Sequence, residues 1–301
     1  MFDRVVMVDW SASSAVGPTR PSPDRCWLAC GDRAQRCQPE YLRTRLEAQE
    51  RIVDLAASCP GRVLVGMDFP FGYPREAGLP VGRRLCRLLA ELIEDGPDGA
   101  NTRFEAAAEL NRRLERAHGP GQAPFWGHPR GRVLADLTPT KPRSCRLGEY
   151  RAVERLLRSW GLPPQSAFKL AGVGSVGSQT LLGLACVHRM LADRRLAARA
   201  LLWPFETGSI PADAVVFAEI WPSLGEHARQ PFEIKDARQV AAARDEVLDA
   251  DDQATLLSAP DDPDAAAEGW ILGVQPLTGA GPKASQPLAP ARRVTSTGTS
   301  A

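Results

Sequence analysis

The chain of 301 residues is long enough for one large α/β domain or two smaller ones, and its 44% hydrophobic content is that of an ordinary globular protein. Its 37 basic and 36 acidic residues leave a formal net charge of +1, so the overall charge does not demand nucleic acid, a membrane surface or an acidic ligand. No stretch reaches the roughly 18 apolar residues that a membrane helix requires, so we expect no membrane partner.

The chain has seven cysteines, an odd number with no repeating spacing. Such a pattern argues against a secreted disulfide scaffold, so we expect free thiols in a cytoplasmic protein. Cys26 and Cys30 could form half of a metal clip, but no second pair accompanies them, and buried thiols are the preferred interpretation. The oligomeric state is left open.

The first predicted element is a strand that ends in an acid. An apolar run directly before Asp9 predicts a strand that is buried on both faces. After a loop rich in Ser, Pro and Gly, a second strand is expected at residues 25–30, followed by an amphipathic helix at 41–57. A further apolar run, residues 62–70, ends in the same way at Asp68. Two buried strands thus end in carboxylates, and each carboxylate needs a partner.

The middle of the chain, about residues 72–203, is helical in character. Amphipathic helices are predicted near residues 82–94, 103–117, 150–159 and 179–201. Loops rich in Pro, Gly and His separate them. We interpret this segment as a helical insertion that packs over one end of the sheet, within a single domain of residues 1–275.

The last third of the chain adds one more acid-bearing strand and one more helix. An apolar strand at residues 214–222 carries Glu219, and a helix with several acids is expected at 236–259. Further on, the composition falls to Pro, Ala, Ser, Thr and Gly. Residues 276–301 are therefore predicted to be a disordered tail.

Four acids are the candidate catalytic and metal-binding residues: Asp9, Asp68, Glu219 and Asp252. Carboxylates gathered at the ends of strands repel one another unless a cation neutralises them. Oxygen ligands favour Mg²⁺ or Mn²⁺, which can activate water for phosphodiester cleavage. Asp252 is preferred to Asp251 because it shares a helical stripe with the apolar residues that follow, although either could be the fourth ligand.

The acids lie in motifs that resemble a known family. The motifs are Val8-Asp9-Trp10-Ser11, Gly66-Met-Asp-Phe-Pro-Phe-Gly-Tyr-Pro74, Glu219-Ile-Trp-Pro222 and the acidic helix before Leu256-Leu257-Ser258-Ala259. In this order, over about residues 3–275, they resemble a domain-of-unknown-function family of predicted RNase H-like nucleases. The resemblance implies an α/β fold with a ribonuclease H-like mixed sheet, flanking helices and a helical insertion, and a metal-dependent nuclease or phosphodiesterase. The family pattern predicts an acid nearer Ala254. The late helix of this chain has its acids earlier, at Asp251 and Asp252, and so departs from that pattern.

Three polar residues near these motifs are candidates for binding the substrate. Ser11 follows Asp9, and its hydroxyl could contact a phosphate or cap the turn. Lys169 precedes a glycine-rich run at residues 171–179, whose amides could cradle a phosphate. Lys235 opens a Lys-Asp-Ala-Arg-Gln run and could reach a phosphate or pair with a site carboxylate.

Trp126 is the fourth candidate for binding the substrate. A base of a nucleic acid or nucleotide could stack between Phe125 and Trp126, with His128 nearby. A packed aromatic loop is the other interpretation.

Two other functions fit the same residues. The first is an ATP-dependent phosphotransferase of the related sugar-kinase and ATPase fold, because Asp9 is followed by small hydroxyl residues and a glycine-rich run occurs later. The second is a non-catalytic nucleotide-binding module. The sequence also leaves open whether a nuclease would act on RNA, DNA or a small nucleotide.

Overall fold

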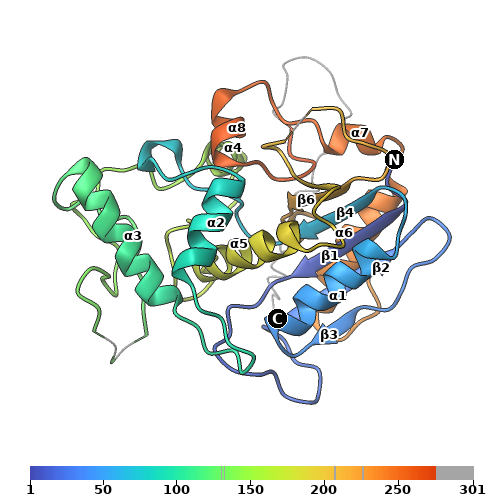
Figure 1. The fold of residues 1–301 in the computed structure, drawn as a ribbon, viewed down its shortest axis with the longest axis horizontal. Helices are drawn as coiled ribbons and strands as arrows, with labels where there is room; N and C mark the ends of the chain where they lie inside the picture. Colours follow the sequence, from blue (N-terminus) through green and yellow to red (C-terminus); the bar gives the residue numbers. More distant parts are fainter. Residues whose placement is uncertain (130, 132, 207, 226, 276–301) are drawn as a thin grey trace, which may run out of the picture.

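The computed structural model describes residues 1–275, except 130, 132, 207 and 226, and shows in them a six-stranded mixed sheet with helices on both faces (Figure 1). The strands are β1 (Arg4–Asp9), β2 (Cys26–Gly31), β3 (Glu40–Leu42), β4 (Val63–Met67), β5 (Ala200–Leu202) and β6 (Val215–Glu219). The helices are α1 (Arg45–Ala57), α2 (Arg83–Leu92), α3 (Arg103–His118), α4 (Ala152–Ser159), α5 (Gly177–Ala192), α6 (Lys235–Asp249), α7 (Gln253–Leu256) and α8 (Pro263–Glu268), with 3-10 turns η1 (Arg75–Ala77) and η2 (Pro222–Leu224). The predicted tail, residues 276–301, lies outside the described residues.

The order of the strands brings the acid-bearing strands together. The sheet runs β3-β2-β1-β4-β6-β5. β1 is parallel to β4, β4 to β6 and β6 to β5, whereas β2 is antiparallel to both β1 and β3. The carboxyl ends of β1, β4 and β6 therefore meet at one edge of the sheet. The predicted α/β class, with a mixed sheet and flanking helices, is confirmed.

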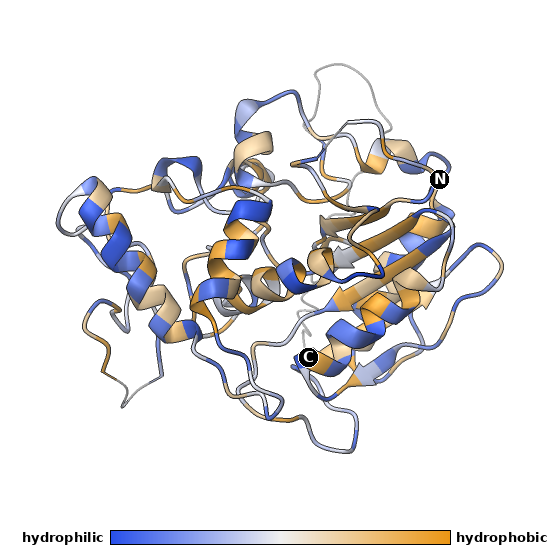
Figure 2. Ribbon diagram, viewed as in Figure 1, coloured by the Kyte–Doolittle hydropathy of each residue, from blue (hydrophilic) through white to orange (hydrophobic). Residues whose placement is uncertain are grey.

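The central strands are buried on both faces, as their uninterrupted apolar sequence predicts. Val6 and Val8 of β1 point into a core shared with α1, α2 and α5. Val5 and Met7 point into a second core, shared with α4 and α6. Figure 2 shows the apolar residues concentrated in the strands and on the inward sides of the helices. Helices of residues 72–203 thus pack into the cores on both faces of the sheet. The domain boundaries inferred from the sequence remain a prediction.

Three predicted helices are longer than the real ones. α1 begins at Arg45, because the residues just before it form the edge strand β3. α5 ends at Ala192, and the last residues of its predicted range form the other edge strand, β5. α6 ends at Asp249, and a separate short helix, α7, begins after Asp252. Edge strands of three residues are too short to show an alternating pattern, so the sequence gives no sign of them.

Two expectations from composition can be compared with the structure. All seven cysteines lie in the described ranges and carry free thiols, five of them buried. Across the described part of the chain, no helix combines the length and the apolar character needed to cross a membrane.

Helix α5 is buried on nearly all sides and packs closely against the chain that follows β4. Most of its residues are buried, so it lies at the centre of the first core. At Gly183 the helix meets the ring of Phe69, and a Cβ atom added there would lie 2.2 Å from the Phe69 Cζ. Real Cβ atoms do not come so close to a carbon, so glycine is needed for this approach.

We expect Gly183→Ala to destabilise the protein by about 1–3 kcal/mol, because the new methyl group overpacks the core against a buried ring. Gly208→Ala is the matched control, since a Cβ atom there meets nothing within 4 Å. Urea unfolding of the two variants checks the prediction. Equal midpoints for them would show that α5 can move away from Phe69 at little cost.

Candidate acidic site

Asp9 and Asp68 lie side by side at the carboxyl ends of two neighbouring parallel strands. Asp9 is the last residue of β1, and Asp68 directly follows β4. Val8 of β1 is paired with Met67 of β4, so the two acids are the next residues in register and point to the same face of the sheet. Both are half-buried. The backbone N–H of Trp10 donates to the Asp68 Oδ1 at 2.7 Å and fixes this carboxyl group.

Both carboxyl groups have raised pKa values. Burial, and then the negative charges of Asp68 and Asp236, raise the pKa of Asp9 well above its ordinary value. Burial also raises the pKa of Asp68 to about 7, although the Trp10 N–H and a hydrogen bond from Asp9 act in the opposite direction. Carboxyl groups whose pKa values are raised by burial and by neighbouring negative charge are stabilised by a nearby cation.

A third acid, Asp236, belongs to the same neighbourhood and was missed from the sequence. It lies in the first turn of α6, is half-buried, and its Oδ2 accepts the backbone N–H of Asp24 at 2.8 Å. Burial raises the pKa of Asp236, and the nearby Lys235 lowers it. The sequence run Lys-Asp-Ala-Arg-Gln contains this acid. The prediction singled out Lys235 in this run, whereas it is the charge of the next residue, Asp236, that raises the pKa of Asp9.

Glu219 is not brought to this pair, because the register of the sheet turns it to the other face. It is paired with Met67 of β4, and Met67 with Val8, so all three share the face opposite to Asp9 and Asp68. There it accepts two hydrogen bonds from the buried Arg151, at 2.6 and 2.7 Å, and one from the N–H of Phe71 at 2.9 Å. Its charge is thus already compensated within the protein.

Asp252 is also kept apart from the pair, because it lies near the amino end of β1, whereas Asp9 is at its carboxyl end. It caps α7 by accepting the N–H of Ala254 at 2.9 Å, and it is exposed. The next residue, Gln253, accepts the N–H of Phe2, just before β1 begins. The whole length of β1, roughly 20 Å, therefore separates Asp252 from Asp9. Asp251, the other candidate, is exposed as well.

The expected site of four carboxylates is therefore not assembled. Within residues 1–275, leaving out the four undescribed positions, no group of three or more His, Cys, Asp or Glu side chains has the geometry to hold a metal ion. Asp9 and Asp68 remain as a pair, with Asp236 as a further negative charge. A pair can suffice for Mg²⁺, which keeps several waters and is often bound by one or two carboxylates together with substrate phosphates.

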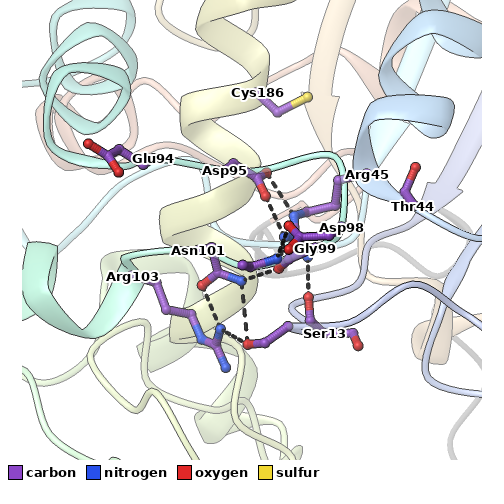
Figure 3. A network of polar contacts seen from close by, with 12 residues as sticks. Ser13, Thr44, Arg45, Glu94, Asp95, Asp98, Gly99, Asn101, Arg103 and Cys186 are labelled. Atoms are coloured by element: carbon purple, nitrogen blue, oxygen red, sulfur yellow. Dashed lines mark hydrogen bonds and ion pairs between the residues drawn. The ribbon is translucent and has the colours of Figure 1, made fainter.

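The loop after Asp9 is fixed by a buried arginine (Figure 3). Arg45 of α1 donates to both carboxylate oxygens of Asp95, at 2.5 and 2.8 Å, and the two side chains are only 3% and 2% exposed. The same guanidinium donates to the carbonyl oxygens of Ser13 at 2.5 Å, Ser11 at 3.3 Å and Gly99 at 3.0 Å. One side chain thus ties α1, the loop after β1 and the loop after α2 together.

The predicted substrate residue Ser11 has a structural partner in this loop. Its side chain is buried, and its hydroxyl donates to the carbonyl oxygen of Asp24 at 3.0 Å while accepting the N–H of Ser13 at 3.2 Å. Asp24 in turn has a left-handed backbone, with φ of 57°. These contacts match the capping role that was the alternative for Ser11.

The glycine-rich run lies before α5, and α5 touches the acidic site through its first turn. Gly172 and Gly174 have positive φ angles, which other residues rarely adopt. Gln179, in the first turn of α5, donates through Nε2 to the carbonyl oxygen of Trp10 at 2.6 Å. The loop before this helix is thus linked to the residue that follows Asp9.

Lys169 and Trp126 are brought together, whereas Lys235 lies apart from them on α6. The Lys169 Nζ is 6.0 Å from the centre of the Trp126 ring. Trp126 is half-buried, but Phe125 is fully buried and belongs to the first core. Of the two aromatic residues proposed to stack on a base, only Trp126 is accessible. Lys235 is exposed and lies beside Asp236.

The comparisons with known proteins add no relatives to these observations. No protein-family model matches the chain, and no curated protein or solved structure matches it either. The family resemblance therefore rests on the quoted motifs alone. Function has to be inferred from the residues and their contacts.

The position of Glu219 leads to a prediction about stability. We expect Glu219→Gln to destabilise the metal-free protein by about 3–5 kcal/mol, because it removes one partner of a buried ion pair. Glu91→Gln, which breaks an exposed pair with Arg87, should cost less than about 1 kcal/mol. Urea unfolding in the presence of EDTA measures both. An unchanged stability of Glu219→Gln would mean that Arg151 does not need this partner.

The raised pKa of Asp68 predicts a pH dependence of stability. Between pH 4 and pH 7 the unfolded chain releases this proton and the folded protein keeps it, so the stability of the wild type falls as the pH rises. The shift alone would amount to about 4 kcal/mol, which contact with solvent reduces to about 1–2 kcal/mol.

Asp68→Asn should therefore be more stable than the wild type at pH 8 and about equally stable at pH 4. Asn removes the charge but can still accept the Trp10 N–H. Thermal melting at the two pH values tests this. The opposite order at pH 8 would mean that the Asp68 carboxylate is compensated in the folded protein.

Proposed function

We propose that the chain is a metal-dependent phosphodiesterase whose acidic site consists of Asp9, Asp68 and Asp236. One observation carries the proposal: two half-buried carboxyl groups, whose pKa values are raised by burial and by neighbouring negative charge, lie side by side at the ends of adjacent parallel strands. The main charges acting on Asp9 are further acids, Asp68, Asp236 and Asp24. Accumulated negative charge of this kind suits a divalent cation and a phosphate that the cation can bridge.

The fold is compatible with this proposal at the level of architecture. A mixed sheet with helices on both faces agrees with the ribonuclease H-like architecture that the sequence motifs imply. A fold by itself does not define an activity. The proposal therefore depends on the acidic pair.

The donor set fits Mg²⁺ or Mn²⁺. Asp9 and Asp68 supply carboxylate oxygens only, and Asp236 adds a nearby negative charge without joining them as a third ligand. A divalent cation bound by such residues activates a water and neutralises charge on a phosphate. Asp9 and Asp68 would hold it in their deprotonated forms, so binding should strengthen as the pH rises through neutrality.

The surrounding residues keep this site in shape. The Trp10 N–H orients Asp68, and Gln179 holds the Trp10 carbonyl from the other side. Arg45 fixes the next turn of the chain through Ser11 and Ser13. These contacts limit the freedom of the backbone that carries Asp9, as a site that positions a reacting group requires.

We expect Mn²⁺-dependent cleavage of single- or double-stranded RNA or DNA by the wild type. Asp9→Asn and Asp68→Asn should lower the rate at least about 100-fold, because each keeps the shape of the side chain and removes a ligand charge. Asp236→Asn should lower it about tenfold. Asp252→Asn should cleave at the wild-type rate, since Asp252 lies near the other end of β1 and Asn also caps helices.

The assay has a second readout that does not require turnover. At pH 8, Mn²⁺ should raise the melting temperature of the wild type and of Asp252→Asn, but not that of Asp9→Asn. Hydrolysis of ATP, or transfer of its phosphate, in place of strand cleavage would support the alternative function of a phosphotransferase. The glycine loop before α5 favours that alternative. Metal binding without any turnover would support a non-catalytic module.

A further inference from the structure

A small cavity beside Trp126 shares no lining residue with the acidic site of Asp9, Asp68 and Asp236. Its volume is about 70 Å³. It is lined by Pro124, Trp126, Lys141, Pro142, Glu149 and Phe168, among others. One water takes up about 10–15 Å³ on this measure, so the cavity has room for about five to seven waters. Prolines and aromatic rings offer flat apolar faces, and the polar side chains lie between them.

The main chain of Trp126 is held in place beside this cavity. Its backbone N–H donates to the carbonyl oxygen of Phe168 at 3.1 Å, and its carbonyl accepts the N–H of Leu170 at 2.9 Å. On the other side, the N–H of Gly127 donates to the carbonyl oxygen of Thr138 at 2.8 Å. The main chain that carries the ring thus lies between two chain segments that both bond to it. A ring on an ordered main chain loses less entropy when a ligand stacks on it than one on a loop that must first become ordered.

Positive charge accompanies the ring. The Lys169 Nζ lies 6.0 Å from the ring centre and donates to the Gln165 Oε1 at 3.0 Å and the Val173 carbonyl at 2.7 Å. An ammonium group has three donors, so these bonds position it without using all of them. Lys141, at the cavity wall, pairs with Glu149 of the same wall at 2.5 Å, so Lys169 is the positive charge left for a ligand on Trp126. A planar ring that carries an anionic group would therefore find an aromatic face in Trp126 and an ammonium group in Lys169.

The cavity is connected to the acidic site through the first turn of α5. The carbonyl of Leu170, next to Lys169, accepts the hydroxyl of Ser178 at 2.7 Å. The next residue, Gln179, donates to the carbonyl of Trp10, which lies between Asp9 and the loop that follows. A substrate of several linked units could therefore reach both places across this helix turn.

We propose that the cavity is a nucleobase subsite, in which a base stacks on Trp126 and its phosphate faces Lys169. This inference rests on the proposed function and narrows its substrate to a nucleotide or a nucleic acid. Stacking on an aromatic side chain accepts any base, because every base has a π-face. The subsite therefore provides affinity for nucleotides with little preference for sequence.

The test is a binding titration by calorimetry in EDTA, with AMP, UMP, adenosine and ribose 5-phosphate as probes. AMP and UMP should bind the wild type, and ribose 5-phosphate should bind at least about tenfold more weakly, since it has no base to stack. Trp126→Ala should weaken AMP about tenfold, while Trp126→Phe, which keeps a ring, should stay within about threefold. Lys169→Met should weaken AMP but not adenosine.

Trp160→Ala is the matched control, because Trp160 is also half-buried but packs in the second core. Its affinity for AMP should equal that of the wild type, and thermal melting confirms that each variant is folded. Absence of AMP binding to the wild type, or equal binding of AMP and ribose 5-phosphate, would overturn the inference, as would full AMP affinity in folded Trp126→Ala. Because EDTA removes metal, these outcomes are independent of the cleavage assay, which alone decides the proposed function.

Discussion

The register of β1, β4 and β6 decides which acids of this protein can meet. In a parallel sheet, residues paired across neighbouring strands point to the same face, and the next residue points to the other. Asp9 and Asp68 each follow a member of the Val8–Met67 pair, so they share a face, whereas Glu219 is itself paired with Met67. A shift of one residue in register thus decides whether an acid joins the Asp9–Asp68 pair or, like Glu219, forms a buried ion pair with Arg151.

The protein treats buried charge in two different ways. At the ends of β1 and β4, burial and the charge of Asp236 raise the pKa values of Asp9 and Asp68. At the end of β6, Arg151 lies between Glu154 and Glu219 with almost no contact with solvent. The second arrangement is a closed network that stabilises the junction of α4 with β6. The first stays open to a cation, which is why it is the better candidate for chemistry.

The sequence predicted Asp9 and Asp68 because the signal is local: each ends an apolar run long enough to be a buried strand. The position of Glu219 could not be predicted, since it depends on how strands far apart in the chain align to a single residue. Asp252 was misplaced by the length assigned to the last long helix, which ends at Asp249. Asp236 was missed because its role comes from the packing of α6 against β1, and its neighbour Lys235 seemed the better functional residue. The α/β class could be predicted from the order of the apolar runs alone. Only the structure shows that Trp126 is partly accessible whereas Phe125 is buried.

The buried contact between Arg45 and Asp95 also constrains how this protein can change in evolution. Loss of either side chain alone would break a buried ion pair, at a cost on the order of several kcal/mol, although Arg189 also lies 3.9 Å from Asp95. The two positions should therefore vary together among homologous chains, and a neutral pair should replace both at once. Because the same guanidinium holds the carbonyls of Ser11 and Ser13, such an exchange would also release the turn after Asp9. Homologous chains in which Arg45 and Asp95 are exchanged together should therefore have a different conformation of the turn after Asp9.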